Sequence, residues 1–283
     1  MSFSDSVTCI SLALALLVPA SSCSSAAQVE ERRCPADPIC YLLVGAKLND
    51  GGSYAEAEKM YLAALQLVEG TLGKEHLTAA SLTQLGNVRI ALGKHEEAKA
   101  VLLKAFEIWA GTRGDPFLAP RALNGLALIY LAQGSAEHAE TFAQQALEIA
   151  EKHPRYATNI ADSLTTLARI YQYQGKLVDA ETSYNRSLAK LEESVGPKHA
   201  DTGLTLTGLA LLYSGHRRYS EAEPLFQRAL PILESAFGPK HQNLVSTLDG
   251  YAALLRKTRR EAEAAVLEAR GNEIRAMRGE KVR

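Results

Sequence analysis

Net charge, aromatic residues and cysteines are all scarce in this chain of 283 residues, and the near absence of net charge excludes one class of partner. The 31 basic and 32 acidic side chains almost cancel, whereas a protein that binds nucleic acid normally presents a basic face. The basic cluster at residues 256–260 is followed at once by Glu261 and Glu263, a pattern typical of a solvated helix end. We therefore expect no nucleic-acid partner.

Motifs of catalysis and of metal or cofactor binding are also missing. The chain contains no HExxH pair, phosphate-binding loop, nucleophile elbow or Gly-rich dinucleotide fingerprint. Three of the seven histidines, His76, His199 and His241, stand at matching places before segments of helical pattern. A catalytic histidine is needed once, beside a nucleophile or a ligand set, so this repetition indicates a structural role. The sequence predicts a protein that is not an enzyme and holds no cofactor or metal; a hydrolase or metal enzyme is the weakest alternative.

Only four cysteines occur, and two of them form a close pair at Cys34 and Cys40. In an oxidising compartment we expect these two to form a disulfide at the start of the folded region. A zinc site is disfavoured because no second pair of ligands stands nearby. A redox-active pair is disfavoured because the spacing is not the two-residue gap of thioredoxin-like proteins.

The first 26 residues resemble an export leader. Residues 10–18 form a run of nine that is apolar except for Ser11, too short to span a bilayer but typical of a secretory signal. A tract of small residues follows, which suits cleavage after Ala26, or lipidation and a membrane tether at Cys23. Asp5, without any Lys or Arg, precedes the apolar run, so an uncleaved or mis-started leader is the alternative. We expect an exported protein, periplasmic, membrane-anchored or secreted, with residues 27–40 as a short linker.

The remainder of the chain is dominated by a repeat of 41 or 42 residues, marked by three columns. Apolar or aromatic marker residues stand at Tyr41, Leu82, Leu123, Leu164, Leu206 and Leu248. Eleven residues after each marker stand Gly52, Gly93, Gly134, Gly175, Arg217 and Arg259, which we call the turn residues. Sixteen residues after each marker stand Ala57, Ala98, Ala139, Ala180, Ala222 and Ala264. A fixed period of this length indicates a solenoid, in which each unit buries its apolar face only by stacking on its neighbours.

Each copy has the pattern of two helices joined by a short turn. In the second copy we place them at 78–92 and 95–110. The turn glycine supplies a left-handed residue after the first helix, so arginine there predicts another turn geometry or some strain. The alanine column predicts a close crossing of the two helices. The expected fold class is all-α, a solenoid of about six helical hairpins over residues 41–278, followed by a tail at 279–283.

The copies resemble the tetratricopeptide repeat. The fourth copy carries the resemblance through residues 164–171, Gly175, residues 179–181 and Tyr184. The longer period, the two Gly-Pro-Lys-His runs that end at His199 and His241, and residues 220–230 resemble the repeats of kinesin light chains. The resemblance implies a right-handed solenoid that acts by protein–protein interaction, since such repeats occur in many unrelated interaction proteins.

The resemblance also implies that the first helix of each hairpin lines a concave groove. Side chains one and five residues after the marker are then Thr83, Asn87, Asn124, Leu128, Thr165, Arg169, Thr207 and Leu211, with Arg121 and Tyr173 beside them. Asn donates to and accepts from a peptide backbone, Arg holds a carboxylate in two hydrogen bonds, and Tyr offers a flat apolar anchor. We expect an adaptor that holds a protein or peptide segment. The alternatives are that these side chains only solvate the inner face, and that the protein is a scaffold acting through its convex face or by end-on self-association.

Three local features give further expectations. Pro231 should kink the helix around it, and Pro224 should cost less because it is expected in the first turn. Trp109 should pack between the second and third copies. Ser53 and Glu56 have the spacing of a capping box.

Overall fold

The computed structural model describes residues 37–111 and 117–277, and all regular structure in these ranges is helical. Six consecutive hairpins are formed by α2 (Pro38–Asp50) with α3 (Tyr54–Val68), α4 (Glu75–Ala91) with α5 (His95–Gly111), α6 (Ala119–Ala132) with α7 (Ala136–Glu151), α8 (Ala157–Tyr173) with α9 (Leu177–Ser194), α10 (Ala200–Gly215) with α11 (Tyr219–Phe237), and α12 (Val245–Lys257) with α13 (Glu261–Ala276). A single 3-10 turn, η2 (Gln242–Leu244), leads into α12.

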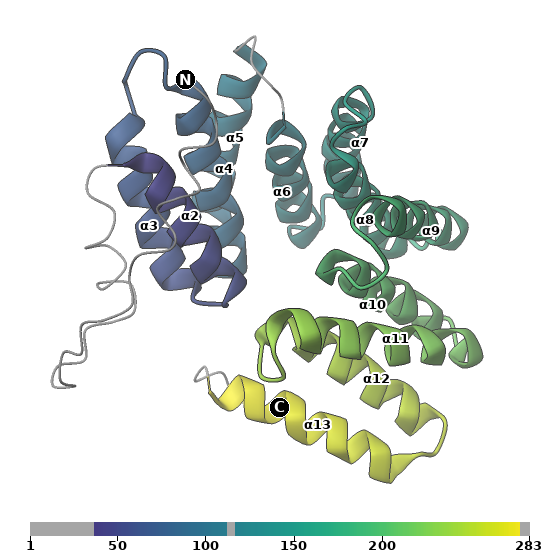
Figure 1. Ribbon diagram of the computed structural model, residues 1–283. Helices are drawn as coiled ribbons and strands as arrows, with labels where there is room; N and C mark the ends of the chain where they lie inside the picture. The colour runs from purple at the N-terminus through teal and green to yellow at the C-terminus, as the bar shows by residue number, and fades with distance from the viewer. Residues whose placement is uncertain (1–36, 112–116, 278–283) are drawn as a thin grey trace, which may run out of the picture.

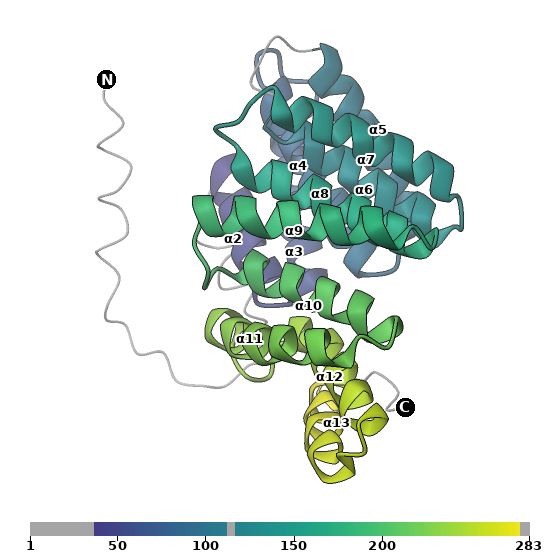
Figure 2. The ribbon, with the colours of Figure 1, turned by 90° about the vertical axis from the view of Figure 1, so that its right-hand side faces the viewer.

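The hairpins stack in chain order into a right-handed α-solenoid, as the sequence predicts (Figures 1 and 2). The first helices α2, α4, α6, α8, α10 and α12 contact one another in succession, and each second helix contacts its own partner and the first helix of the next hairpin. The first turn, residues 52–56, and Met277 at the end of α13 line one common hollow of about 640 Å³. The superhelix therefore brings its two ends close together.

The buried columns are those that the repeat predicts. All six alanines of the alanine column are completely buried, which allows the two helices of each hairpin to cross closely. The marker leucines from Leu82 to Leu248 are at most 1% exposed and form the core between hairpins. In the second copy the helices span 75–91 and 95–111, within three residues of the expected ranges.

The turn residues all adopt the left-handed conformation, arginines included. The four glycines have φ of 74° to 79°, and Arg217 and Arg259 have φ of 61° and 64°. The sequence left two outcomes open for the arginine turns, a different turn geometry or strain. The geometry is unchanged, so these turns are strained, because a side chain at positive φ comes close to its own backbone.

Two local expectations are wrong, one is confirmed and one remains a prediction. Ser53 precedes α3 without capping it through its side chain, because its ψ of 62° departs from the extended backbone of a capping residue. Pro224 is the sixth residue of α11, in its second turn. Trp109 packs against Ala79 and Ala119, which belong to the second and third hairpins, as expected. Helix α11 continues through Pro224 and Pro231, and the kink stays a prediction.

The N-terminal expectations fall mostly outside the described residues. Cys40 is disulfide-bonded, while Cys34, Cys23 and Ala26 lie outside the described ranges, so the Cys34–Cys40 pairing stays a prediction. Among the helices of residues 37–111 and 117–277, none is both long and apolar enough to cross a bilayer.

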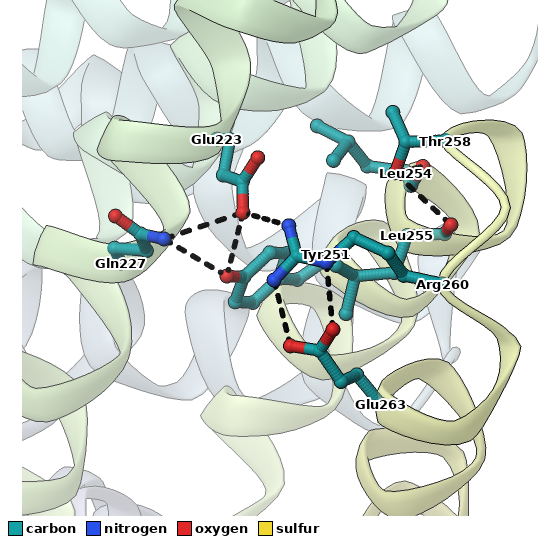
Figure 3. Close-up of polar contacts among 8 residues, drawn as sticks. All are labelled: Glu223, Gln227, Tyr251, Leu254, Leu255, Thr258, Arg260 and Glu263. Carbon is teal, nitrogen blue, oxygen red and sulfur yellow. Dashed lines mark hydrogen bonds and ion pairs between the residues drawn. The ribbon is translucent and has the colours of Figure 1, made fainter.

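One column of ion pairs ties consecutive hairpins together on the turn side at four of the five junctions. A glutamate six residues after the turn residue of one hairpin contacts the basic residue that directly follows the next turn residue. The pairs are Glu58–Lys94 at 2.6 Å, Glu140–Lys176 at 3.2 Å, Glu181–Arg218 at 2.7 Å, and Glu223–Arg260. Figure 3 shows the last pair, where the Tyr251 hydroxyl also donates to Glu223 and Glu263 binds the same guanidinium.

A second column joins consecutive second helices near the opposite, loop end. An acid seventeen residues after one turn residue contacts a base eleven residues after the next. The pairs are Glu69–Lys104 at 2.5 Å, Glu151–Arg186 at 3.1 Å, Glu192–Arg228 at 2.5 Å, and Glu234–Arg270. Each exposed pair contributes at most about 1 kcal/mol, so their main effect is to fix the register of adjacent hairpins.

Candidate ligand groove

Two neighbouring hollows lie along the first helices of the hairpins. The small hollow, of about 250 Å³, lies between α4, α6 and α8 and is lined by Asn87, Arg121, Asn124, Gly125, Leu128, Asp162, Thr165 and Thr166. The large hollow, of about 680 Å³, lies over α6, α8, α10 and α12, and its lining includes Leu131, Arg169, Tyr173, Leu204, Leu211 and Ser246. Thr165 lines both hollows, so they adjoin, and we call the two together the groove.

The structure brings most of the expected residues to this groove and excludes one of them. Asn87, Arg121 and Asn124 line the small hollow, and Arg169 and Tyr173 line the large one. Thr83 is completely buried, with its hydroxyl 2.8 Å from the Ala79 carbonyl that accepts from it. It cannot reach a ligand, and its assignment to the groove is wrong.

The burial of Thr83 has a general cause, because the residue directly after each marker points into the seam between consecutive first helices. In that seam Asn124 contacts Ser163 at 3.1 Å, and Thr207 contacts Thr247 at 2.9 Å. A polar residue there is satisfied mainly by the neighbouring hairpin. From the third copy to the sixth, the residue two before the marker lines the groove instead.

Asn124 is the exception within this seam because part of its amide has no partner. The residue is 7% exposed, its amide nitrogen donates to the Ser163 hydroxyl, and its Oδ1 is buried with no hydrogen bond from any described residue. A buried carbonyl oxygen without a donor is costly. Although Asn124 lines the small hollow, this oxygen has almost no accessible surface, so a ligand would reach it only if the neighbouring side chains moved.

Asp162 and Arg121 place opposite charges at one side of the small hollow. The distance between Asp162 Oδ2 and Arg121 Nε is 3.9 Å, and about a third of the Asp162 side chain remains exposed. Burial raises the pKa of Asp162 to about 6; Arg121 and His199 oppose this shift, and the negative charge of Asp201 adds to it. Asp162 is therefore mostly ionised at neutral pH and titrates in mildly acidic solution.

The large hollow combines a cation with apolar walls. Arg169 is exposed and forms no ion pair with any described residue. Tyr173, one helical turn further along α8, is 61% exposed, and Leu131, Leu204 and Leu211 supply apolar surface. An unpaired guanidinium binds a carboxylate with two hydrogen bonds, and an exposed aromatic ring packs on an apolar side chain.

Sequence reasoning missed several groove residues for which a signal was present. Arg121 was identified two residues before its marker, and the same position in the later copies is Asp162, Leu204 and Ser246. All four line the hollows. Applying that column to every copy would have found them.

No group of three or more His, Cys, Asp and Glu side chains within the described ranges is arranged to hold a metal ion. The groove instead offers hydrogen-bonding amides, one free cation and apolar surface. This set of side chains suits recognition of a chain segment and does not by itself supply a nucleophile with a base.

The comparisons with known proteins agree with the repeat seen in the structure. BtubC (BKLC) from P. vanneervenii superposes with a TM-score of 0.60 at 20% identity over 82% of this chain and 91% of that one. A Podosopora anserina putative kinesin light chain with nearly identical TPR-like repeats gives 0.50 at 22% identity over 71% and 96%. A Rap protein gives 0.66 at 15% identity over 88% and 72%. At these identities the likeness shows the fold alone.

No curated protein sequence matches the chain. The family model described as tetratricopeptide repeat matches residues 40–111, 77–152 and 159–235. Because these matches span well over half of the 283 residues and coincide with the observed hairpins, the chain belongs to the tetratricopeptide repeat family.

Proposed function

We propose that the protein is a non-enzymatic adaptor whose groove, made of the small and large hollows, binds an extended peptide or protein segment. The observation that carries the proposal is the unpaired Arg169 beside the exposed Tyr173, in a hollow with apolar walls. An exposed guanidinium that has no partner among the described residues, and that lies beside an exposed aromatic ring, favours a carboxylate-bearing ligand.

The small hollow supports the same ligand class. Asn87 provides an amide for backbone groups of a ligand, and Thr165 links this region to the large hollow. An extended segment lying along both hollows would place a backbone amide over Asn87 and an acidic side chain or chain end at Arg169. A Rap protein of similar fold is known complexed with competence and sporulation factor.

The proposal is tested by selecting displayed random peptides on the purified protein and measuring their affinities. We expect selected peptides to bind the wild type, and to lose about tenfold or more in affinity for Arg169→Ala, because a charge-assisted bidentate contact is lost. The matched control is Arg217→Ala, which removes another exposed arginine that lines neither hollow. Equal loss in both variants, or no selectable peptide, would contradict groove binding.

The rival function is a scaffold that acts by self-association through its convex face or its ends. Ile39 and Leu43 leave an exposed apolar strip on α2, which is the first described helix. Sedimentation of the mature chain distinguishes the two: a concentration-dependent dimer or longer array favours the scaffold, and a monomer with peptide affinity favours the adaptor.

The place of action is a separate proposal that rests on the leader sequence. We propose export, with Cys23 as the site of a lipid tether. Cell fractionation of wild type and Cys23→Ala provides the measurement. Release of the variant from membranes supports lipidation, and retention of both proteins in the cytosol contradicts export.

A further inference from the structure

Both columns of ion pairs are interrupted at one and the same junction, between the second hairpin (α4–α5) and the third (α6–α7). On the turn side, Lys99 and Ser135 stand where every other junction has an acid and a base. On the loop side, Ala110 and Gln145 stand at the corresponding positions. The remaining four junctions carry both pairs, so this one lacks the charges that fix the register elsewhere.

The contacts that replace the ion pairs are less directional. The Lys99 ammonium lies over the Tyr130 ring, 4.3 Å from its centroid, and the exposed Gln133 amide donates to Glu96 at 2.7 Å. A cation above a ring tolerates lateral displacement, whereas a guanidinium and a carboxylate hold a fixed geometry. The seam between first helices also lacks its hydrogen bond here, because Ala122 stands where the later copies carry a hydroxyl partner for the residue after the marker.

The candidate groove crosses this junction. Asn87 belongs to the second hairpin, whereas Arg121 and Asn124 belong to the third, and all three line the small hollow. A relative movement of the two hairpins therefore changes the width of that hollow. It also changes the gap between the first turn and Met277, which lie on opposite sides of the junction in the chain.

We propose that the α5–α6 junction is the hinge of the superhelix, about which the first two hairpins move as one body against the last four. Movement there opens and closes the small hollow. The hinge is independent of the proposed function, while its effect on ligand entry rests on that function.

The test measures distance distributions by pulsed electron resonance on the ligand-free full chain. Spin labels on p-acetylphenylalanine, which leaves the native cysteines untouched, are placed ten residues after the turn residue in consecutive second helices. Leu103 and Gln144 span the proposed hinge, and Gln144 and Asn185 span the next junction; all three positions are exposed. We expect the distribution across 103 and 144 to be the broader of the two.

Two double variants test whether a difference in distribution width arises from the missing charges. Ala110→Glu with Gln145→Arg restores the loop-side pair, and we expect it to narrow the distribution across 103 and 144 to that of the control pair. Glu192→Ala with Arg228→Gln removes the corresponding pair two junctions later, and we expect a broader distribution between labels at Asn185 and Gln227. Equal widths in the wild type would overturn the hinge, and so would a restored pair that leaves the width unchanged. Because no ligand is present, a failure here is distinct from a failure of peptide binding.

Discussion

Arg217 and Arg259 hold a backbone conformation that glycine holds in the four preceding hairpins. Neither residue forms an ion pair with any residue of 37–111 or 117–277, so no charged contact within these ranges offsets the strain at these turns. At the scale of single residues, the fifth and sixth turns thus depart from the repeat, and the departure lowers the stability of the folded chain.

Replacing these arginines with glycine should stabilise the protein. The left-handed conformation costs a residue with a side chain about 1–2 kcal/mol, and the extra freedom of glycine in the unfolded chain offsets part of the gain. For Arg217→Gly we expect a net increase of up to about 1 kcal/mol in the free energy of unfolding, measured with urea. Arg217→Ala keeps the Cβ and is the control; an equal gain from alanine would show that the strain is not the cause.

Asp162 predicts a pH dependence of stability. Its pKa is raised to about 6 in the folded protein, so the folded state binds the proton more tightly than the unfolded chain does. The wild type should therefore gain stability relative to Asp162→Asn as the pH falls from 7 to 4, by about 1 kcal/mol once solvent exposure is taken into account. Urea unfolding of both proteins at several pH values measures this difference. A difference that stays constant with pH would show that Asp162 is not perturbed.

At the scale of helices, close approach is governed by glycine at defined positions. A Cβ on Gly125 of α6 would lie 2.8 Å from Leu102 Cδ1 and 3.0 Å from Asn87 Oδ1. Glycine there lets α6 pack against both helices of the preceding hairpin, directly beneath the small hollow. Gly215 near the end of α10 has no such neighbours within 4 Å.

These two glycines should respond to alanine with opposite signs. Gly125→Ala should destabilise the protein by about 1–3 kcal/mol through overpacking, and should displace Asn87. Gly215→Ala should stabilise it by about 0.5–1 kcal/mol, because alanine restricts the unfolded chain and suits a helix. Thermal and urea unfolding of both variants provide the comparison. A stabilising Gly125→Ala would mean that α4 and α6 are less closely packed than described.

The positions of the helices could be predicted from the sequence, but part of the groove lining could not. The marker, turn and alanine columns are dictated by packing within a repeated unit, so their spacing alone predicts the hairpins. Whether a polar residue such as Thr83 faces solvent or the seam depends on the rotation between consecutive hairpins, which no single repeat encodes. The same applies to the capping residue Ser53, whose backbone angle is set by the turn before it.

At the scale of the molecule, the ion-pair columns divide the solenoid into two and four hairpins. In a stacked array, stability is the sum of the hairpins and of the interfaces between neighbours. The interface that lacks both pairs should be the first to separate when the structure opens.

Native-state hydrogen exchange should show this division. We expect the amides of α2–α5 to form one cooperative unit and those of α6–α13 to form further units with different free energies of opening. Restoring the loop-side pair with Ala110→Glu and Gln145→Arg should bring the two sets of values closer together. A single common opening energy in the wild type would show that the whole solenoid unfolds as one unit.

The shared hollow between the first turn and the end of α13 also limits how cargo can arrive. Because the two ends of the superhelix lie close together, we expect a folded domain to be too bulky to reach the groove from the side. An unfolded segment is narrow enough to enter. Recognition would then favour a partner caught before it has folded, or one that keeps a loose tail afterwards.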